Sequence, residues 1–213
     1  MGHAGMAAAA VRYLRSVRAA PEREPVEMLP RPELRCVGED ERAPVGQAEF
    51  RRVLGNFATG VAVVTAPATA GAPQAPGSTD DPQAAAPAGF ACQSFSSLSL
   101  DPPLVAFMVG RTSTTWPRIA RAGVFCVNVL SAGQAELCRA FAVSGADKFA
   151  GVSYDAAPAS GSPRLAGTLA WIDCTIHAVH TGGDHLIVVG RVEALGASDG
   201  EEAPLLFHKG RFL

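Results

Sequence analysis

The sequence has no long hydrophobic run and no excess of charge of one sign. Its 213 residues include 18 Lys or Arg and 20 Asp or Glu, so its formal net charge is −2. A balanced charge argues against a nucleic-acid partner. No apolar stretch approaches the ~20 residues that a membrane-spanning helix needs. We therefore expect a globular protein that binds neither nucleic acid nor membrane.

Paired cysteines are also missing. The five cysteines are odd in number and form no Cys-x-x-Cys pair; they are Cys36, Cys92, Cys126, Cys138 and Cys174. Four of them stand among apolar residues, which is typical of reduced thiols rather than of a disulfide framework. The pattern predicts a cytoplasmic protein.

Several well-known catalytic motifs do not occur. The sequence has no Gly-x-Gly-x-x-Gly after a strand, no Gly-Lys-Ser/Thr loop and no Gly-x-Ser-x-Gly elbow. These absences argue against a Rossmann unit and against Ser-His-Asp hydrolysis. His177 and His180 are three positions apart in an expected strand, so they point to opposite faces and cannot chelate one ion. We therefore predict no metal site.

The chain is expected to consist of an extension and one domain. Residues 1–46 contain scattered prolines and charges without periodicity, and we interpret them as a flexible or surface-wrapping extension. Their first 20 residues carry three arginines and no acid, which faintly resembles a transit peptide; a plain polar or helical extension is the alternative. The domain spans 47–213, and its Ala- and Pro-rich segment 66–88 is expected to be a long loop between two strands.

Strands outnumber helices in the expected domain. Apolar residues recur at helical spacing from Phe50 to Phe57, and further helices are expected at 113–121 and 131–143. Strands are expected at 61–65, 90–98, 104–109, 124–130, 169–179 and 185–195, with a turn-rich link at 161–167. Turns rather than helical crossovers join these strands. The fold class is therefore mainly β, an antiparallel barrel with a few peripheral helices.

A Ser-rich segment stands out between Gly89 and Leu104. Its serines alternate with Phe95, Leu98 and Leu100 and stop at a Pro pair. One interpretation is a β-edge whose hydroxyls meet solvent. The other is that hydroxyl and backbone donors beside apolar surface hold a flat, partly polar ligand with a phosphate tail.

Two further motifs have a structural and a functional interpretation. Ser113-Thr-Thr-Trp-Pro117 is typical of a helix start, and free N–H groups there also suit a phosphate. Gly182-Gly-Asp-His185 is typical of a hairpin turn, but His185 opens the second strand and is expected near the barrel mouth.

Taken in order, these motifs and Asp147-Lys-Phe149 resemble the short-chain flavin reductase family. The resemblance covers roughly Phe50 to Phe212. It implies the FMN-binding split barrel, a Greek-key antiparallel barrel that forms a homodimer. It also implies an NAD(P)H:flavin oxidoreductase that uses FMN or FAD with NADH or NADPH, and releases reduced flavin to a partner monooxygenase or halogenase.

The resemblance implies roles for single residues. Flavin contacts are expected from Thr59, Gln93, Ser94, Phe95, Ser96, Ser97, Ser99, Ser113, Thr115, Lys148 and Phe149. Nicotinamide contacts are expected from Asp184, His185 and His208, and His185 is the expected catalytic residue. Gln93 stands where the family more often has Asn, and Ala91 where Thr is common.

Two other functions suit the same barrel. One is an oxidoreductase that keeps FMN tightly bound and reduces another acceptor. The other is a non-catalytic module that binds flavin or haem. The Gly-Asp-His motif favours catalysis, because such a module does not need it.

Overall fold

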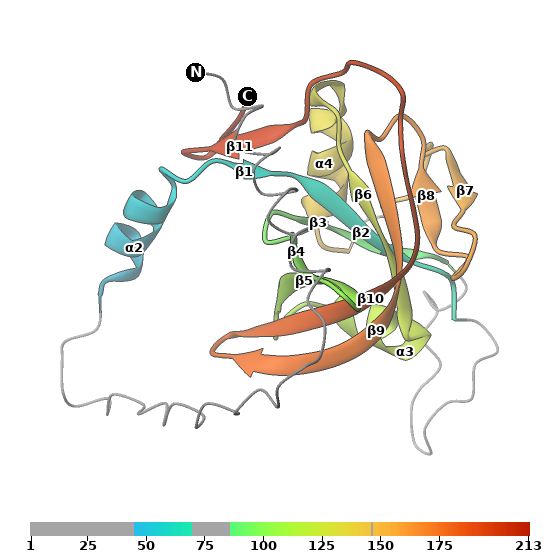
Figure 1. The fold of residues 1–213 in the computed structure, drawn as a ribbon. Coiled ribbons are helices and arrows are strands. Elements are labelled where there is room, and N and C mark those ends of the chain that lie inside the picture. Colours follow the sequence, from blue (N-terminus) through green and yellow to red (C-terminus); the bar gives the residue numbers. More distant parts are fainter. Residues whose placement is uncertain (1–44, 70–85, 146) are drawn as a thin grey trace, which may run out of the picture. The chain divides into compact units, whose positions relative to one another are not determined.

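The computed structural model describes residues 45–69, 86–145 and 147–213 (Figure 1). The chain divides into the units 1–44 and 45–213, and the fold below is that of the second unit. The expected extension at 1–46 and the expected loop at 66–88 lie largely outside the described residues. No described helix is both long enough and apolar enough to cross a membrane.

The described residues form mainly antiparallel β-structure. The main sheet has seven strands in the order β3-β2-β6-β9-β10-β5-β4. Its strands are β2 (Ala62–Ala66), β3 (Ala88–Cys92), β4 (Ser96–Leu100), β5 (Pro103–Gly110), β6 (Val124–Val129), β9 (Ala170–Gly182) and β10 (His185–Ala197). Two small sheets accompany it, one of β1 (Thr59–Gly60), β11 (Leu206–His208) and β12 (Arg211–Phe212), the other of β7 (Tyr154–Ala156) and β8 (Pro163–Leu165).

The main sheet curls until β3, at one edge, approaches β5, next to the other edge. Ser94 follows β3 directly; its hydroxyl accepts the Met108 N–H at 2.8 Å and donates to the Met108 carbonyl at 3.1 Å. The rings of Phe90 and Phe107 lie 5.9 Å apart across the same seam. Among the described strands, β3 and β5 share no backbone ladder. The barrel is therefore split at this seam, which confirms the predicted fold class.

Successive side chains of β2 pack into two different hydrophobic cores. Val64 packs inside the barrel with Phe107 and Phe125, whose rings meet edge-on at 5.2 Å. Val63 points the other way, into a second cluster with Phe141. Because successive strand residues face opposite sides, a strand buried along its whole length requires cover on both faces. The burial of all five residues of β2 follows from this arrangement.

The helices supply that cover. Helix α3 (Trp116–Ala122) buries Trp116 and Ile119 against the barrel interior, and Pro117 lies in its first turn as expected. Helix α4 (Ala135–Ala142) buries Cys138 and Phe141 in the second cluster. A short 3-10 turn, η2 (Ala132–Gln134), precedes α4, and the Gln134 side chain accepts the Ser131 N–H at 3.1 Å, the expected capping contact.

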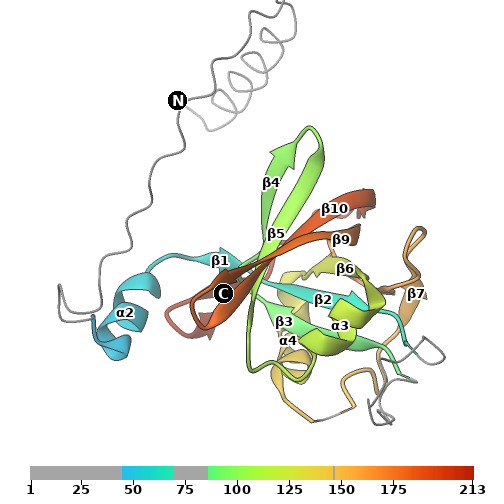
Figure 2. The ribbon, with the colours of Figure 1, turned by 90° about the horizontal axis from the view of Figure 1, so that it is seen from below.

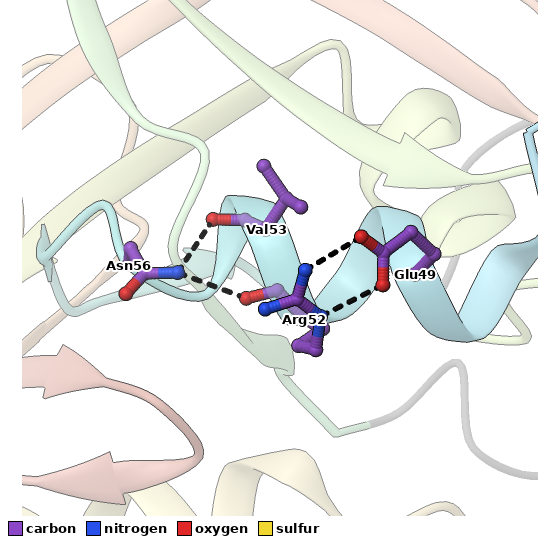
Figure 3. Close-up of polar contacts among 4 residues, drawn as sticks. All are labelled: Glu49, Arg52, Val53 and Asn56. Carbon is purple, nitrogen blue, oxygen red and sulfur yellow. Dashed lines mark hydrogen bonds and ion pairs between the residues drawn. The ribbon is translucent and has the colours of Figure 1, made fainter.

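Helix α2 (Gln47–Leu54) buries none of its residues. Figure 3 shows the polar contacts that hold it: Glu49 pairs with Arg52 at 2.6 Å, and the Asn56 amide donates to the carbonyls of Arg52 and Val53 at 3.0 Å each. The predicted amphipathic helix is present, but its apolar side chains are exposed in this chain. Phe50 in the helix is 56% exposed, and Phe57, which lies beyond the end of the helix at Leu54, is 77% exposed.

Two expected segments differ from the observed ones. The single strand expected at 90–98 is two strands, because β3 pairs with β2 whereas β4 pairs with β5. The chain crosses from one partner to the other at Gln93–Phe95, where no ladder is possible. The link expected at 161–167 contains β8, whose register with β7 matches Tyr154 to Leu165.

Candidate functional site

A cleft of about 820 Å³ lies at the split between β3 and β5. One wall is the end of β3 with Gln93 and Ser94, and the opposite wall is the end of β5 from Met108 to Gly110. The turn after β5 and the residues that follow α4 continue the lining, and β11 and β12 close one side. A volume of this size is that of a small-molecule or cofactor site.

The cleft carries positive and neutral polar groups. Lys148 and His185 contribute to its lining, and no carboxylate is found among the described residues that line it. Backbone segments, hydroxyls and apolar side chains such as Phe90 and Val109 make up most of the rest. A partly apolar ligand with an anionic end suits this combination.

His185 is positioned by the β9–β10 hairpin. Gly183 adopts φ +67° in the turn, a conformation that favours glycine. The pairing register then sets His185 opposite Gly110 of β5. A methyl group at Gly110 would lie 3.9 Å from His185 Nε2, so the imidazole lies over the end of β5. Two strands of the barrel thus hold this side chain at the cleft.

Asp184 orients the imidazole of His185. Its Oδ1 lies 2.7 Å from His185 Nδ1. A carboxylate only accepts hydrogen bonds, so Nδ1 carries the hydrogen and Nε2 remains for a ligand. The hydrogen bond from His185, and secondly its charge, lower the pKa of Asp184. Asp184 itself is 93% exposed and does not line the cleft.

Ser113 and Thr115 lie in the turn between β5 and α3, and both line the cleft. Ser113 N–H donates to Gly110 O at 2.9 Å, and its hydroxyl accepts the Trp116 N–H at 3.2 Å. The helix expected to start at Ser113 begins instead at Trp116, with Thr115 at its N-cap and no side-chain cap bond. Thr112 and Thr114 add two more hydroxyl residues to the same wall.

Lys148 reaches the cleft from the segment after α4. Its ammonium group donates to the carbonyls of Gly89 and Phe141, at 3.1 Å each. Burial, and secondly the charge of Arg118, lower the pKa of Lys148. Phe149 beside it packs edge-on against Phe141 at 5.0 Å and lines a second, neighbouring cavity.

The structure thus brings together Gln93, Ser94, Ser113, Thr115, Lys148 and His185. The other residues predicted for the site lie outside the cleft of this chain. Ser96, Ser97 and Ser99 belong to edge strand β4, which extends away with β5 in Figure 2. Phe95 packs against the barrel interior.

Thr59 and His208 lie on the small C-terminal sheet. Thr59 pairs with Phe207, and its hydroxyl is buried without a hydrogen-bond partner. Phe207 lines the cleft, and His208 next to it does not. Neighbouring residues of a strand point to opposite faces, so the His208 side chain leaves the strand on the other side.

Sequence reasoning missed several lining residues. Phe207 and Phe212 form an aromatic pair, with centroids 5.4 Å apart, at the side that β11 and β12 close. In the sequence, the segment that contains them predicted only a strand that closes the barrel. Ser144 also lines the cleft, and its position shortly before Lys148 was the available signal.

The described residues contain no group of three His, Cys, Asp or Glu side chains arranged to hold a metal ion.

The comparison with protein families identifies the class. Residues 54–213 match the flavin reductase like domain. This match covers most of the chain and almost all of the described fold, so the chain belongs to the flavin reductase-like family. Its fold is that of solved flavin reductases.

Individual relatives are named as flavin reductases or as reductase subunits, in agreement with the family match. The reductase subunit HsaB of a flavin-dependent monooxygenase from Rhodococcus jostii is 47% identical over 163 residues, 76% of this chain and 75% of that protein. The FMN reductase (NADH) SmoA from Agrobacterium fabrum is 37% identical, over 76% of this chain and 83% of its own. The solved structure of the NADH:FAD oxidoreductase SgcE6 from Streptomyces globisporus is 36% identical, with a TM-score of 0.67 over 80% of this chain and 94% of that one.

Proposed function

We propose that this protein transfers a hydride from NADH to free FMN or FAD and releases the reduced flavin. The observation that carries the proposal is the cleft at the β3–β5 split, with Lys148 and His185 among its lining and no described carboxylate. Flavin and nicotinamide supply the redox chemistry, hydride passing from nicotinamide C4 to flavin N5. The protein needs no nucleophile for this reaction. It needs to bind and align two rings.

The residues of the cleft fit these tasks. Ser113, Thr115 and Lys148 lie together and supply hydroxyl and ammonium donors for a flavin phosphate. His185 would hold the nicotinamide, because Asp184 fixes its ring and its strand pairing sets it beside Gly110 at the cleft. The apolar residues Phe90 and Val109 exclude water beside the ring system.

The four described cysteines are free and buried, which supports a reducing, cytoplasmic location. Burial raises the pKa of Cys126 to about 12, with a smaller contribution from the charge of Asp173. Such thiols stay protonated and unreactive. A separate monooxygenase is the proposed acceptor of reduced flavin, because the HsaB relative is named as a reductase subunit of such an enzyme.

We also propose a homodimer. Helix α2, the turn that follows it and edge strand β4 expose apolar side chains, with Phe57 in the turn and Leu100 in β4 each 77% exposed. Exposed apolar residues gathered on unpaired elements are typical of protein interfaces. A second copy of the chain would cover them.

The decisive experiment is steady-state NADH oxidation with FMN or FAD in large excess over protein. The proposal expects NADH consumption far beyond protein stoichiometry. Consumption limited to one equivalent would contradict it. Protein that stays yellow through long dialysis and reduces only another acceptor would instead indicate an enzyme with tightly bound FMN.

His185→Ala tests the catalytic assignment. We expect kcat/KM for NADH to fall by at least about tenfold, because a misaligned ring loses much of the benefit of orientation. Flavin affinity should change little. His177→Ala is the matched control, since His177 is exposed on the same hairpin and does not line the cleft. Equal kinetics of the two variants would remove His185 from the mechanism.

A further inference from the structure

Met108 turns away from the barrel core, although its neighbours in β5 are buried. Phe107 and Val109 are 0% and 4% exposed and belong to the core, whereas Met108 is 45% exposed. Successive residues of a strand face opposite sides, so Met108 shares its face with Gly110. Met108 also lines the cleft, and it is the only large apolar side chain on this face of β5 that does so.

Strand pairing places Met108 beside His185. His185 pairs with Gly110, and two residues further on Ile187 pairs with Met108. Paired residues have their side chains on the same face of the sheet, and diagonal neighbours lie ~7–8 Å apart, within reach of a long side chain. Ile187 does not line the cleft; its side chain leans toward β9, where a β-carbon at Gly182 would lie 3.3 Å from Ile187 Cδ1. Met108 is therefore the apolar neighbour of His185 in the cleft.

The backbone of Met108 is held from the opposite wall. The Ser94 hydroxyl accepts the Met108 N–H at 2.8 Å and donates to the Met108 carbonyl at 3.1 Å. A hydroxyl has a single hydrogen, and here the Met108 carbonyl takes it. One residue thus fixes both backbone polar groups of Met108. Ser94 positions Met108, and the Met108 side chain is what this part of the wall presents to a ligand.

A thioether suits contact with a flat aromatic ring. Methionine is flexible and polarisable, and its sulfur makes favourable contacts with aromatic rings, often at the ring edge. It also carries no charge, so it does not repel the negative charge that a flavin gains on reduction. Gly110 leaves room next to it, because a β-carbon there would lie 3.9 Å from His185 Nε2. The wall is therefore open beside His185 and apolar beside the seam.

We propose that Met108 is a contact residue of the isoalloxazine ring and that this contact positions the ring for the nicotinamide at His185. This proposal rests on the proposed function. Hydride transfer depends on close alignment of the two rings, so a contact that fixes one ring affects the rate as well as the affinity. Because Met108 would touch only the ring, its effect should be the same for every flavin, whatever the tail.

Flavin binding without NADH is the first test, measured by quenching of flavin fluorescence. Met108→Ala should weaken riboflavin, FMN and FAD by the same factor, about three- to tenfold, since the ring is what they share. Met108→Leu keeps the apolar volume and should recover most of the lost affinity. Val179→Ala is the matched control, because Val179 is 43% exposed and does not line the cleft. Wild-type affinities in Met108→Ala, or a loss confined to FMN and FAD, would overturn the proposal.

Kinetics separate the flavin ring from the nicotinamide. At saturating FMN, Met108→Ala should lower kcat by about threefold or more and change the KM for NADH little. A raised KM for NADH together with an unchanged flavin affinity would assign Met108 to the nicotinamide and contradict the proposal. Failure of the proposed function would look different, since wild type would then oxidise NADH with neither FMN nor FAD.

Oxidation of Met108 offers a chemical test. Hydrogen peroxide transfers one oxygen to a thioether and leaves water, which gives a polar sulfoxide. Met108 is the only methionine among residues 45–213, and wild type and Met108→Leu share the other three, Met1, Met6 and Met28. Peroxide-treated wild type should therefore lose flavin affinity as Met108→Ala does, whereas treated Met108→Leu should keep its own. Riboflavin should slow oxidation of the peptide that contains Met108, measured by mass spectrometry. Equal losses in both proteins, or no protection by riboflavin, would contradict the contact.

Discussion

Lys148 lies where the cleft and the second cavity meet, and its ammonium group donates to the carbonyls of Gly89 and Phe141. Burial puts its pKa below the ordinary value of 10.5. A bound phosphate favours the protonated form. The contribution of Lys148 to phosphate affinity is therefore complete at pH values below its pKa and is lost as the pH rises through that pKa.

This gives a pH prediction. FMN affinity relative to riboflavin affinity should decline at a pH below 10.5 in wild type, because riboflavin lacks the phosphate that Lys148 would hold. Lys148→Arg should shift the decline to higher pH, since arginine stays charged. Equilibrium titrations with both ligands across the alkaline range measure the difference. The same ratio at every pH would remove Lys148 from the phosphate site.

Ser94 differs from the other serines of its segment. Its hydroxyl holds the backbone of Met108 from across the seam. We expect Ser94→Ala to lower the free energy of unfolding by about 1–2 kcal/mol, because two seam hydrogen bonds are lost. Ser96→Ala, on exposed β4, should stay within about 0.5 kcal/mol of wild type. Urea unfolding of both variants measures the two changes in free energy of unfolding. Equal losses of stability would contradict the assignment of Ser94 to the seam.

The sequence could not separate these serines. It showed a polar segment with interleaved apolar residues, and it predicted one shared role. Which hydroxyl crosses the seam depends on where β3 ends and β4 begins, and this follows from pairing with β2 and β5. The pairing of β4 with β5 is local, whereas β2 ends at Ala66, far before β3 begins at Ala88. His185 was easier to place, because the hairpin that positions it is local in sequence.

Elements with a local signal were predicted well. The β9–β10 hairpin and the capped helix after Ser131 were expected and are observed. In β9, Cys174 belongs to the barrel core and Ile172 packs against it. The exposure of α2 could not be predicted. An amphipathic pattern indicates that one face of the helix is apolar, but not whether that face packs against its own chain or against another molecule.

Gly190 of β10 shows how closely the barrel interior is packed. A β-carbon there would lie 2.3 Å from the Phe125 ring, at an irregularity in the β9–β10 register. We expect Gly190→Ala to cost about 1–3 kcal/mol of stability through overpacking. Gly133→Ala is the control, because a β-carbon there meets nothing within 4 Å. Thermal unfolding measures both, and an unchanged midpoint for Gly190→Ala would show that Phe125 can move aside.

At the scale of the whole molecule, the apolar residues of α2 and of the turn after it would form the interface of the proposed dimer. Leu54→Glu with Phe57→Glu should shift the protein toward monomer, because charges would be buried at the interface. Arg51→Glu changes charge on the same exposed helix and should leave the dimer intact. Light scattering after size exclusion gives the masses. A wild type that is monomeric at micromolar concentration would contradict the proposal.

The pairing of His185 with Gly110 has a consequence for preparations of this protein. A hairpin shifted by one residue would turn the imidazole to the outside of the barrel, since side chains alternate between faces. Such molecules would retain β-structure by circular dichroism yet oxidise NADH poorly. Specific activity therefore reports the fraction of molecules with correctly aligned strands. Spectroscopic checks of folding would not detect the misaligned ones.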